Sequence, residues 1–527
     1  MSATSFKISA LALSLSAVGA CADQGAHTNL DQAEGRRVLA STPQALTAPT
    51  TYLVVYKPAP FTTVLYVPAT ASFDISVAGG KLVSSFPDIG VAVAQSTSET
   101  FASKLAKNLL VEGVTATGAA GIALSPASFS PPAWPPLGNL PAAPAPTPGA
   151  EPLAGYQWNM DQIHAAQARA ITPGRRSIVV GVADSGIDDS HVDLAGQVDT
   201  KRSVSCVGGI PDDRAASWRA DDAGHGTAMA GVIAAKKNGK GVAGIAPGVS
   251  LAAIKVAQYV PDIDYYAIYP EAFVCGLYWA ANRGVNLVNA SLALDPWLYN
   301  CPSDPAQKTI ITATQRAVAY ASSKNVTVVA AMSNEGEDLT KKSMDPYTGA
   351  AVTPDCKLLP VEASNVIGVS AVGFTGDLAF YSNYGLGVTD FAAPGGDMFV
   401  DAVGYPSPQI ISPIPKTSSI YNWAAGWDGR VGVNCSDGLD PNDSTDVTAC
   451  EETYALLQGT SIATPHVTGI AALALSKNPL LTPTALFNAL KAGATPKACP
   501  AASTCEGPVA NNGYFGNGLV DALNTID

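Results

Sequence analysis

The sequence predicts an α/β protein whose main domain has three layers, with a parallel sheet between two layers of helices. Two features predict this fold. After residue 156, short β-branched runs alternate with longer runs of small residues, and the β-branched runs are apolar without a break, as in strands covered on both faces. With 527 residues, 47% of them hydrophobic, the chain is long enough for one large core and a small accessory domain.

Five runs are expected to form strands of this sheet, and two runs are expected to form helices beside it. The strands are expected over 177–183, 249–254, 287–292, 326–330 and 366–369. The helices are expected over 226–235 and 462–476. Pro465 is compatible with the second helix, because the N–H groups of a first helical turn have no partner within the helix.

Three short motifs each carry one side chain suited to nucleophilic catalysis, in the order acid, base, nucleophile. They are Asp184-Ser-Gly-Ile-Asp188, His225-Gly-Thr-Ala228 and Gly459-Thr-Ser-Ile-Ala-Thr-Pro-His466. A serine hydroxyl is a poor nucleophile until a base takes its proton, and the base needs a third group that fixes its tautomer. Asp184 would end a strand, whereas His225 and Ser461 would each begin a helix, where the dipole favours a nearby oxyanion.

Together these motifs resemble those of the subtilisin-like serine proteases (subtilases, peptidase family S8), over about residues 156–523. The resemblance implies a serine endopeptidase with Asp184, His225 and Ser461 as its catalytic triad. It also implies that Asn334, in Val328-Val-Ala-Ala-Met-Ser-Asn-Glu-Gly336, is the oxyanion-hole donor. In a subtilisin, removal of that donor costs roughly 10²–10³ in turnover.

The resemblance further implies two walls that bind an extended substrate by strand addition. These walls are Ser291, Leu292 and Ala293 on one side and Ala331, Met332 and Ser333 on the other. Ala293 and Ser333 stand where the family usually has glycine, so we expect a narrowed S1 pocket that favours Ala, Val or Leu over Phe and Trp at P1. Ile462 replaces the family's usual methionine, so activity is expected to resist peroxide.

Other readings of the same residues are weaker. Ala228 departs from the family's usual second histidine, which leaves a catalytically weak or inactive subtilase-fold binding protein as the alternative function. A sedolisin-type peptidase would carry glutamate in place of His225, and an esterase would carry a Gly-x-Ser-x-Gly elbow around Ser461. Asp188 and Asp189 are interpreted as polar loop residues. The remaining histidines are interpreted as solvated or structural; they are His27, His164, His191 and His466.

Calcium is the only cofactor that the sequence suggests, and the chemistry itself requires none. Asp193 and Asn238 match positions at which many subtilases bind structural calcium, and hard oxygen ligands suit this ion. Two lysines flank Asn238-Gly239, and the N-terminal segment offers no obvious side-chain ligand. No Cys/His spacing resembles a zinc site.

The N-terminus predicts export. Residues 1–20 resemble a signal peptide, and Val18-Gly-Ala-Cys21 resembles a bacterial lipobox in which Cys21 is lipidated; plain cleavage after Ala20 is the alternative. The protein would then be extracellular or attached to the cell envelope, and a lipid on Cys21 would be its only membrane contact. Eight further cysteines suggest up to four disulfides, of which Cys435–Cys450 and Cys499–Cys505 are the favoured pairs.

The regions before and within the main domain have distinct compositions. Residues 21–50 are expected to be a polar tether and 51–124 a small α+β domain, with strands over 52–56, 80–86 and 91–94 and a helix over 98–110. This domain resembles an inhibitory propeptide, so we expect a self-processed zymogen. A Pro/Ala-rich linker covers 125–152, the catalytic domain covers 153–527, and an insertion at about 397–457 is expected to be a surface excursion stapled by a disulfide.

Charge and composition limit the partners. The formal net charge of −13, without a basic stripe, disfavours nucleic acid. The expected partners are protein or peptide substrates and the chain's own propeptide, and the expected oligomeric state is a monomer.

Overall fold

The computed structural model describes residues 48–117, 150–261, 265–400, 402–405, 407–416, 430–433, 452–501 and 503–527. The predictions of a signal peptide, of lipidation at Cys21 and of the Cys435–Cys450 disulfide lie outside the described residues. The tether and linker lie almost wholly outside them as well. The boundaries of the tether and of the linker stay predictions.

A seven-stranded parallel sheet forms the centre of the main domain, in the order β15-β14-β12-β10-β5-β7-β6. Its strands are β5 (Val179–Asp184), β6 (Val204–Ser205), β7 (Ser250–Lys255), β10 (Leu287–Ala290), β12 (Thr327–Ala331), β14 (Val366–Val372) and β15 (Phe391–Pro394). All six residues of β5 are buried, as its unbroken apolar run predicted.

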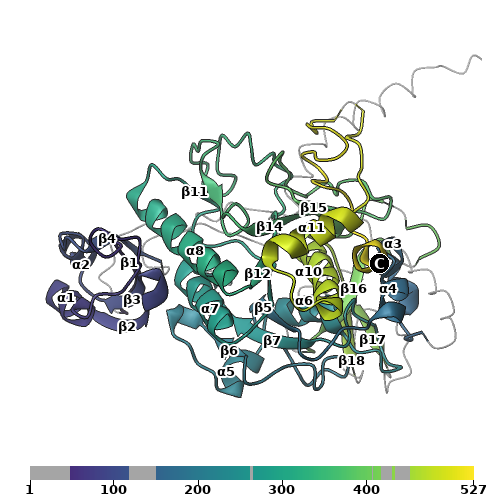
Figure 1. Cartoon of the computed structure of the whole chain (residues 1–527), viewed down its shortest axis with the longest axis horizontal. Coiled ribbons are helices and arrows are strands. Elements are labelled where there is room, and N and C mark those ends of the chain that lie inside the picture. Colours follow the sequence, from purple (N-terminus) through teal and green to yellow (C-terminus); the bar gives the residue numbers. More distant parts are fainter. Residues whose placement is uncertain are drawn as a thin grey trace, which may run out of the picture.

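Helices cover both faces of this sheet and complete the predicted three layers. On one face lie α6 (His225–Ala234) and α10 (Thr460–Lys477), which pack against each other. On the other lie α7 (Pro270–Asn282) and α8 (Pro305–Ser323), next to the N-terminal domain (Figure 1). Close packing of α10 depends on its small residues: a Cβ at Gly469 would stand 2.8 Å from Cβ of Ile245.

Shorter elements surround this framework. They are the helices α3 (Trp158–Gln162), α4 (Ala165–Ile171), α5 (Ala215–Arg219), α11 (Pro483–Gly493) and α12 (Ala522–Ile526), the 3₁₀ turns η4 (Ala154–Tyr156) and η5 (Val207–Gly209), and the strands β8 (Ala257–Val260), β9 (Tyr265–Ile268), β11 (Tyr299–Asn300) and β13 (Lys357–Leu358). Within the described part of the chain, no helix is both long and apolar enough to cross a bilayer.

The N-terminal domain is an antiparallel sheet of order β2-β3-β1-β4 with two short helices. Its elements are β1 (Thr50–Tyr56), α1 (Ala71–Ala78), β2 (Lys81–Phe86), η3 (Pro87–Ile89), β3 (Val91–Ser96), α2 (Phe101–Leu105) and β4 (Val111–Ala116). The helix predicted over 98–110 is wrong in length: α2 ends at Leu105, and Asn108 turns the chain by accepting a hydrogen bond from the backbone N–H of Leu110 at 2.9 Å.

Strand β1 is apolar throughout because both of its faces are buried. Tyr52 and Val54 pack in a cluster with α1 and α2, whereas Leu53 and Val55 pack in the cluster that contains α7 and α8. The N-terminal domain therefore shares a hydrophobic core with the main domain.

Polar contacts hold the same interface. Arg316 of α8 forms an ion pair of 2.5 Å with Glu112, and its Nη1 donates at 2.8 Å to the backbone carbonyl of Tyr56. The rings of Phe86 and Tyr278 lie 5.2 Å apart. These contacts place β1 and β4 against α7 and α8 (Figure 1).

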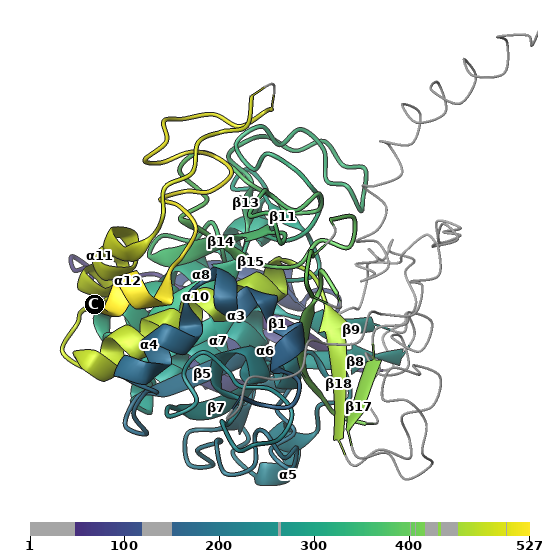
Figure 2. The same ribbon diagram turned by 90° about the vertical axis from the view of Figure 1, so that its right-hand side faces the viewer.

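The insertion contributes a three-stranded sheet of order β16-β18-β17, made of β16 (Ile410–Ile414), β17 (Arg430–Val433) and β18 (Glu452–Leu457). Figure 2 shows β17 and β18 side by side. The expectation of a surface excursion is wrong at both ends of the insertion, because β16 is wholly buried and β18 nearly so. β16 packs on α6: the hydroxyl of Ser412 donates to the backbone carbonyl of Ala228 at 2.6 Å.

Three disulfides join described residues. Cys499–Cys505 is present as predicted, and Cys206–Cys275 and Cys301–Cys356 are pairings that the sequence left open. These two link cysteines 69 and 55 residues apart, so no local loop signalled them.

Glu271 is a carboxyl group buried beside the N-terminal domain. It is 1% exposed. Gly209 lies between it and the N-terminal domain, since a Cβ added at Gly209 would stand 2.9 Å from Val93 and 3.0 Å from Glu271. Burial raises the pKa of Glu271 from 4.5 to about 7, and a hydrogen bond from Thr117 opposes the rise. Its Oε2 has no partner among the described residues.

The raised pKa predicts that Glu271 contributes stability that is full below pH 4.5 and is lost as pH rises through about 7. Glu271→Gln keeps the shape of the side chain and removes the titration. We therefore expect the variant to gain about 2–3 kcal/mol relative to the parent between pH 5 and pH 8. Denaturant unfolding of the intact chain at both pH values, in a Ser461→Ala background, measures this difference. A constant difference across this range would contradict the prediction.

Candidate active site

Asp184 and His225 meet at the carboxyl edge of the sheet, as the sequence predicts. Asp184 is the last residue of β5 and is 3% exposed, and His225 is the first residue of α6. Nδ1 of His225 lies 2.9 Å from both carboxylate oxygens of Asp184. Asp189 instead pairs with Arg219 at 2.8 Å, so Asp184 is the acid that faces the imidazole.

A second carboxylate, Asp221, lies behind this pair. The hydroxyl of Ser185 lies 3.2 Å from Oδ1 of Asp184 and 2.6 Å from Oδ1 of Asp221, and it accepts the N–H of Gly226. Asp221 also accepts the backbone N–H of Thr227 at 2.8 Å. The strand end and the start of α6 are thus held by one hydrogen-bonded network.

Asp221 is a residue that sequence reasoning missed. It is buried, and burial raises its pKa, against its hydrogen bonds from Ser185 and Thr227. The available signal was an acidic side chain four residues before His225, where a helix N-terminus has unpaired N–H groups.

Ser461 lies in the first turn of α10 and is 9% exposed. The preceding Gly459 has φ 146°, and a Cβ at this glycine would stand 3.0 Å from Oγ of Ser461. A side chain there would crowd the hydroxyl of Ser461. The hydroxyl of Ser291 donates at 2.6 Å to the backbone carbonyl of Ser461 and fixes the loop from the other side.

Asn334 is held so that its amide has one orientation. Its Oδ1 accepts the backbone N–H of Thr460 at 2.7 Å and the hydroxyl of Thr460 at 2.8 Å. A Cβ added at Gly459 would stand 3.7 Å from Oδ1 of Asn334 as well as 3.0 Å from Oγ of Ser461. Asn334 and Ser461 therefore border the same space. Because Thr460 holds Oδ1 of Asn334, the amide nitrogen of Asn334 points away from Thr460.

The six predicted wall residues differ in what their side chains do. Leu292, Ala293 and Ala331 are nearly buried, and Met332 is fully buried in the core. Ser333 has φ 68°, the left-handed region that favours glycine, and its hydroxyl donates to Glu335 at 3.0 Å. The Ser333 hydroxyl is thus engaged with Glu335, so a narrowed S1 pocket rests on Ala293 alone.

Three histidines other than His225 have structural contacts. His466 is fully buried against Asn159 at 2.7 Å, and burial lowers its pKa to about 4. His191 is buried beside Thr453 and Glu452, and burial lowers its pKa to about 4 as well. His164 pairs with Asp521 at 2.7 Å near the surface. Their surroundings agree with the interpretation that they do not catalyse.

The two predicted calcium ligands, Asp193 and Asn238, do lie together. Asp193 accepts hydrogen bonds from Nδ2 of Asn238 at 3.2 Å, from the N–H of Val242 at 3.1 Å and from the hydroxyl of Tyr454 at 2.8 Å. Donors face this carboxylate where a calcium ion would need further oxygen ligands, so the arrangement does not fit calcium as it stands. One buried oxygen in this neighbourhood, Oε2 of Glu151, has no partner among the described residues.

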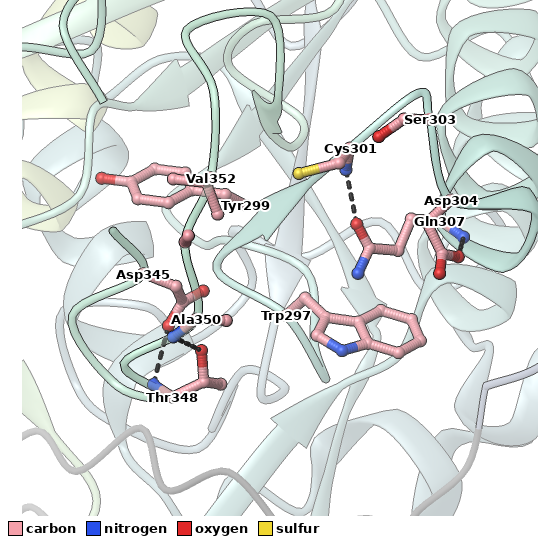
Figure 3. A pocket seen from close by; sticks show the side chains of 11 residues that line it. Trp297, Tyr299, Cys301, Ser303, Asp304, Gln307, Asp345, Thr348, Ala350 and Val352 are labelled. Carbon is pink, nitrogen blue, oxygen red and sulfur yellow. Dashed lines mark hydrogen bonds between the residues drawn. The ribbon is translucent and has the colours of Figure 1, made fainter. Parts of the chain in front are cut away.

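A cavity of about 230 Å³ lies apart from these groups, at the start of α8 (Figure 3). Its polar lining is already engaged: Asp304 accepts the N–H groups of Ala306 and Gln307, and Asp345 accepts that of Thr348. It contains none of the predicted catalytic residues, and we assign it no catalytic role.

Comparison with known sequences identifies the family. Residues 175–518 match the Subtilase family, and the chain belongs to it. Over 345 residues it is 29% identical to subtilisin DY of Bacillus licheniformis, covering 66% of this chain and 89% of that protein. It is 29% identical over 367 residues to alkaline elastase YaB of Bacillus sp. (strain YaB), covering 69% and 68%. It is 28% identical to fervidolysin of Fervidobacterium pennivorans, covering 63% of this chain but only 39% of that protein.

Solved structures show the same fold. The epidermin leader peptide processing serine protease (EpiP) of Staphylococcus aureus aligns with a TM-score of 0.64 at 20% identity, covering 91% of this chain and 98% of that one. Fervidolysin aligns with a TM-score of 0.57 at 22% identity, covering 94% and 63%. At these identities the likeness concerns the fold alone.

The hydrogen bonds around Asp193 predict that Tyr454 stabilises this loop without a metal. Tyr454→Phe leaves a buried carboxylate oxygen with one donor fewer, and we expect a loss of about 1–3 kcal/mol in the free energy of unfolding. Tyr259→Phe, at a half-exposed tyrosine, is the matched control. EDTA is expected to leave the Tm of the parent chain unchanged; a large loss of Tm that calcium restores would contradict this prediction.

Proposed function

We propose that this protein is a serine endopeptidase that hydrolyses peptide bonds through an acyl-enzyme on Ser461. His225 takes the proton of the Ser461 hydroxyl as Oγ bonds to the substrate carbonyl carbon, and it then gives that proton to the departing amine. In the second half of the reaction, water attacks the ester bond of the acyl-enzyme while His225 takes a proton from the water, and His225 then returns a proton to Ser461. The observation that carries the proposal is the pair of 2.9 Å contacts between His225 and a buried Asp184, with Ser461 beginning a helix of the same layer.

Two groups would stabilise the oxyanion of the tetrahedral intermediate. Asn334 would donate from its amide nitrogen, and the backbone N–H of Ser461 would donate from the start of α10, where the helix dipole adds to the effect. Support comes from the two hydrogen bonds that Thr460 donates to Oδ1 of Asn334, because they fix the orientation of the Asn334 amide before a substrate binds.

Substrates are proposed to be proteins or peptides, with a small or medium apolar residue at P1. Ala293 supports this preference, and a relative named an alkaline elastase agrees with it, since elastase-type specificity depends on a small pocket. Ser333 gives the preference no further support, because its hydroxyl bonds to Glu335.

The N-terminal domain is proposed to be an inhibitory propeptide, removed when the chain processes itself. Its support is the shared core with α7 and α8 and the ion pair between Glu112 and Arg316. Export is proposed from the predicted signal over 1–20, and the three disulfides agree with an oxidising compartment. A lipid on Cys21 would stay with the propeptide after processing.

Ser461→Ala tests the mechanism and the zymogen together. We expect loss of casein hydrolysis and a chain that remains at full length, because both reactions need the same nucleophile. Asn334→Ala is expected to lower kcat by roughly 10²–10³ with little change in KM. Rates with a peptide substrate and the intact mass of the purified chain measure these effects.

The control is Ser323→Ala, at an exposed serine near the end of α8. It should process and hydrolyse like the parent. Casein hydrolysis that survives in Ser461→Ala would overturn the proposed function.

A further inference from the structure

Glu335, the residue after Asn334, is a buried acid on which three hydrogen-bond donors converge. Its side chain lies in a residue that is 9% exposed. Oε1 accepts the hydroxyls of Ser333 at 3.0 Å and of Tyr347 at 2.8 Å, and Oε2 accepts the side-chain amide of Asn383 at 2.5 Å. A carboxylate is the one side chain that accepts on both of its polar atoms, so it suits a place at which every neighbour donates.

Asn383 fixes the backbone on both sides of Asn334. It is fully buried, and its backbone N–H donates at 3.1 Å to the carbonyl of Ser333. Its side-chain Oδ1 accepts the backbone N–H of Glu335 at 3.0 Å and that of Glu337 at 2.9 Å. The residue before Asn334 and the residue after it are thus both bonded to Asn383, and Glu335 in turn holds the amide of Asn383.

The backbone of Ser333 shows that this arrangement is under tension. Its φ of 68° lies in the left-handed region, which costs free energy for a residue other than glycine. Such a conformation persists only where surrounding contacts enforce it. The hydroxyl bond to Glu335 and the bond from Asn383 to the Ser333 carbonyl are contacts of this kind. A glycine would adopt the same φ freely, but it has no hydroxyl with which to bind Glu335.

The third donor on Glu335 comes from the long loop between β12 and β13. Tyr347 is placed there by Asp345, which is 2% exposed and accepts the backbone N–H of Tyr347 at 3.0 Å. The Cys301–Cys356 disulfide closes the end of the loop. The hydrogen bonds to Glu335 are therefore in place before a substrate binds.

An oxyanion donor is effective only at a narrow range of distances from the developing charge. The backbone bonds around Asn334 and the bonds from Thr460 to its Oδ1 act on the two ends of the same residue. Donors must lie about 2.7–3.1 Å from the oxyanion, and a misplacement of about 1 Å can cost roughly 10² in rate. Contacts that fix the backbone of Asn334 therefore bear on turnover as well as on stability.

We propose that Glu335 is a positioning residue for the oxyanion donor: it fixes the backbone on both sides of Asn334, so that the amide nitrogen of Asn334 meets the negative charge of the tetrahedral intermediate. The inference rests on the proposed function and deepens it, because Glu335 acts through Asn334. Its effect falls on kcat rather than on KM, since the oxyanion is absent from the bound substrate.

Hydrolysis of a peptide p-nitroanilide with leucine at P1 tests this role, with rates referred to processed chains counted by intact mass. We expect Glu335→Ala to lower kcat roughly 10-fold to 10²-fold with little change in KM. Glu335→Gln keeps the length of the side chain and one acceptor oxygen, so it should restore the larger part of the loss. Ser333→Ala removes one of the three hydrogen bonds and should lower kcat about threefold or more.

A double-mutant cycle separates positioning from a general effect on the active site. With Asn334→Ala already in place there is no amide left to position, so Glu335→Ala is expected to lower kcat by less than about twofold further. If Glu335→Ala lowered kcat in that background by as large a factor as in the parent, Glu335 would act on something other than Asn334, and the proposal would be overturned.

Asp390→Ala is the matched control for a loss of stability. Asp390 lies just before β15, at the opposite edge of the sheet, and accepts the N–H of Gly368 at 2.9 Å. This variant should unfold at lower denaturant and keep its kcat. If Glu335→Ala does not fold, Ser333→Ala decides: an unchanged kcat there would overturn the positioning role alone. Absence of hydrolysis in the parent would overturn the proposed function, and the positioning role with it.

Discussion

The buried carboxylate of Asp184 is the constraint on which the active-site edge depends. It is 3% exposed, so donors within the protein must replace its lost water. The imidazole of His225 and the N–H of Ser185 supply them, and the Ser185 hydroxyl passes the network on to Asp221 and Gly226. Moving α6 would leave buried charges without partners. The end of β5 and the start of α6 therefore keep a fixed relative position.

The loop before Ser461 is held to this edge by elements far apart in the chain. The insertion returns through β18 directly into the loop before Ser461, and the Tyr454 hydroxyl on that strand contacts Asp193, nine residues beyond Asp184. Ser291 and Asn334 fix the same loop from the ends of β10 and β12. The stability of this edge and the position of Ser461 therefore depend on the same hydrogen bonds.

The sequence was sufficient for the framework but not for the network behind it. Strand runs such as 177–183 and the Asp184, His225 and Ser461 motifs carry their signals locally, so the sheet and the contact between Asp184 and His225 could be predicted. Tyr454 could not, because its partner Asp193 comes from another element and appears only after folding, and the only signal for Asp221 was its place four residues before His225. The buried ends of the insertion were missed since Pro, Gly and Asp in its middle outweighed the short apolar runs of β16 and β18.

Covalent labelling tests the central claim most directly. Diisopropyl fluorophosphate reacts with a serine only where a base activates its hydroxyl and an oxyanion site accepts the new charge. The account predicts one label per chain, on the peptide that contains Ser461, formed at least about 10³-fold more slowly in His225→Ala. A label on another residue, or an unchanged labelling rate in His225→Ala, would contradict it.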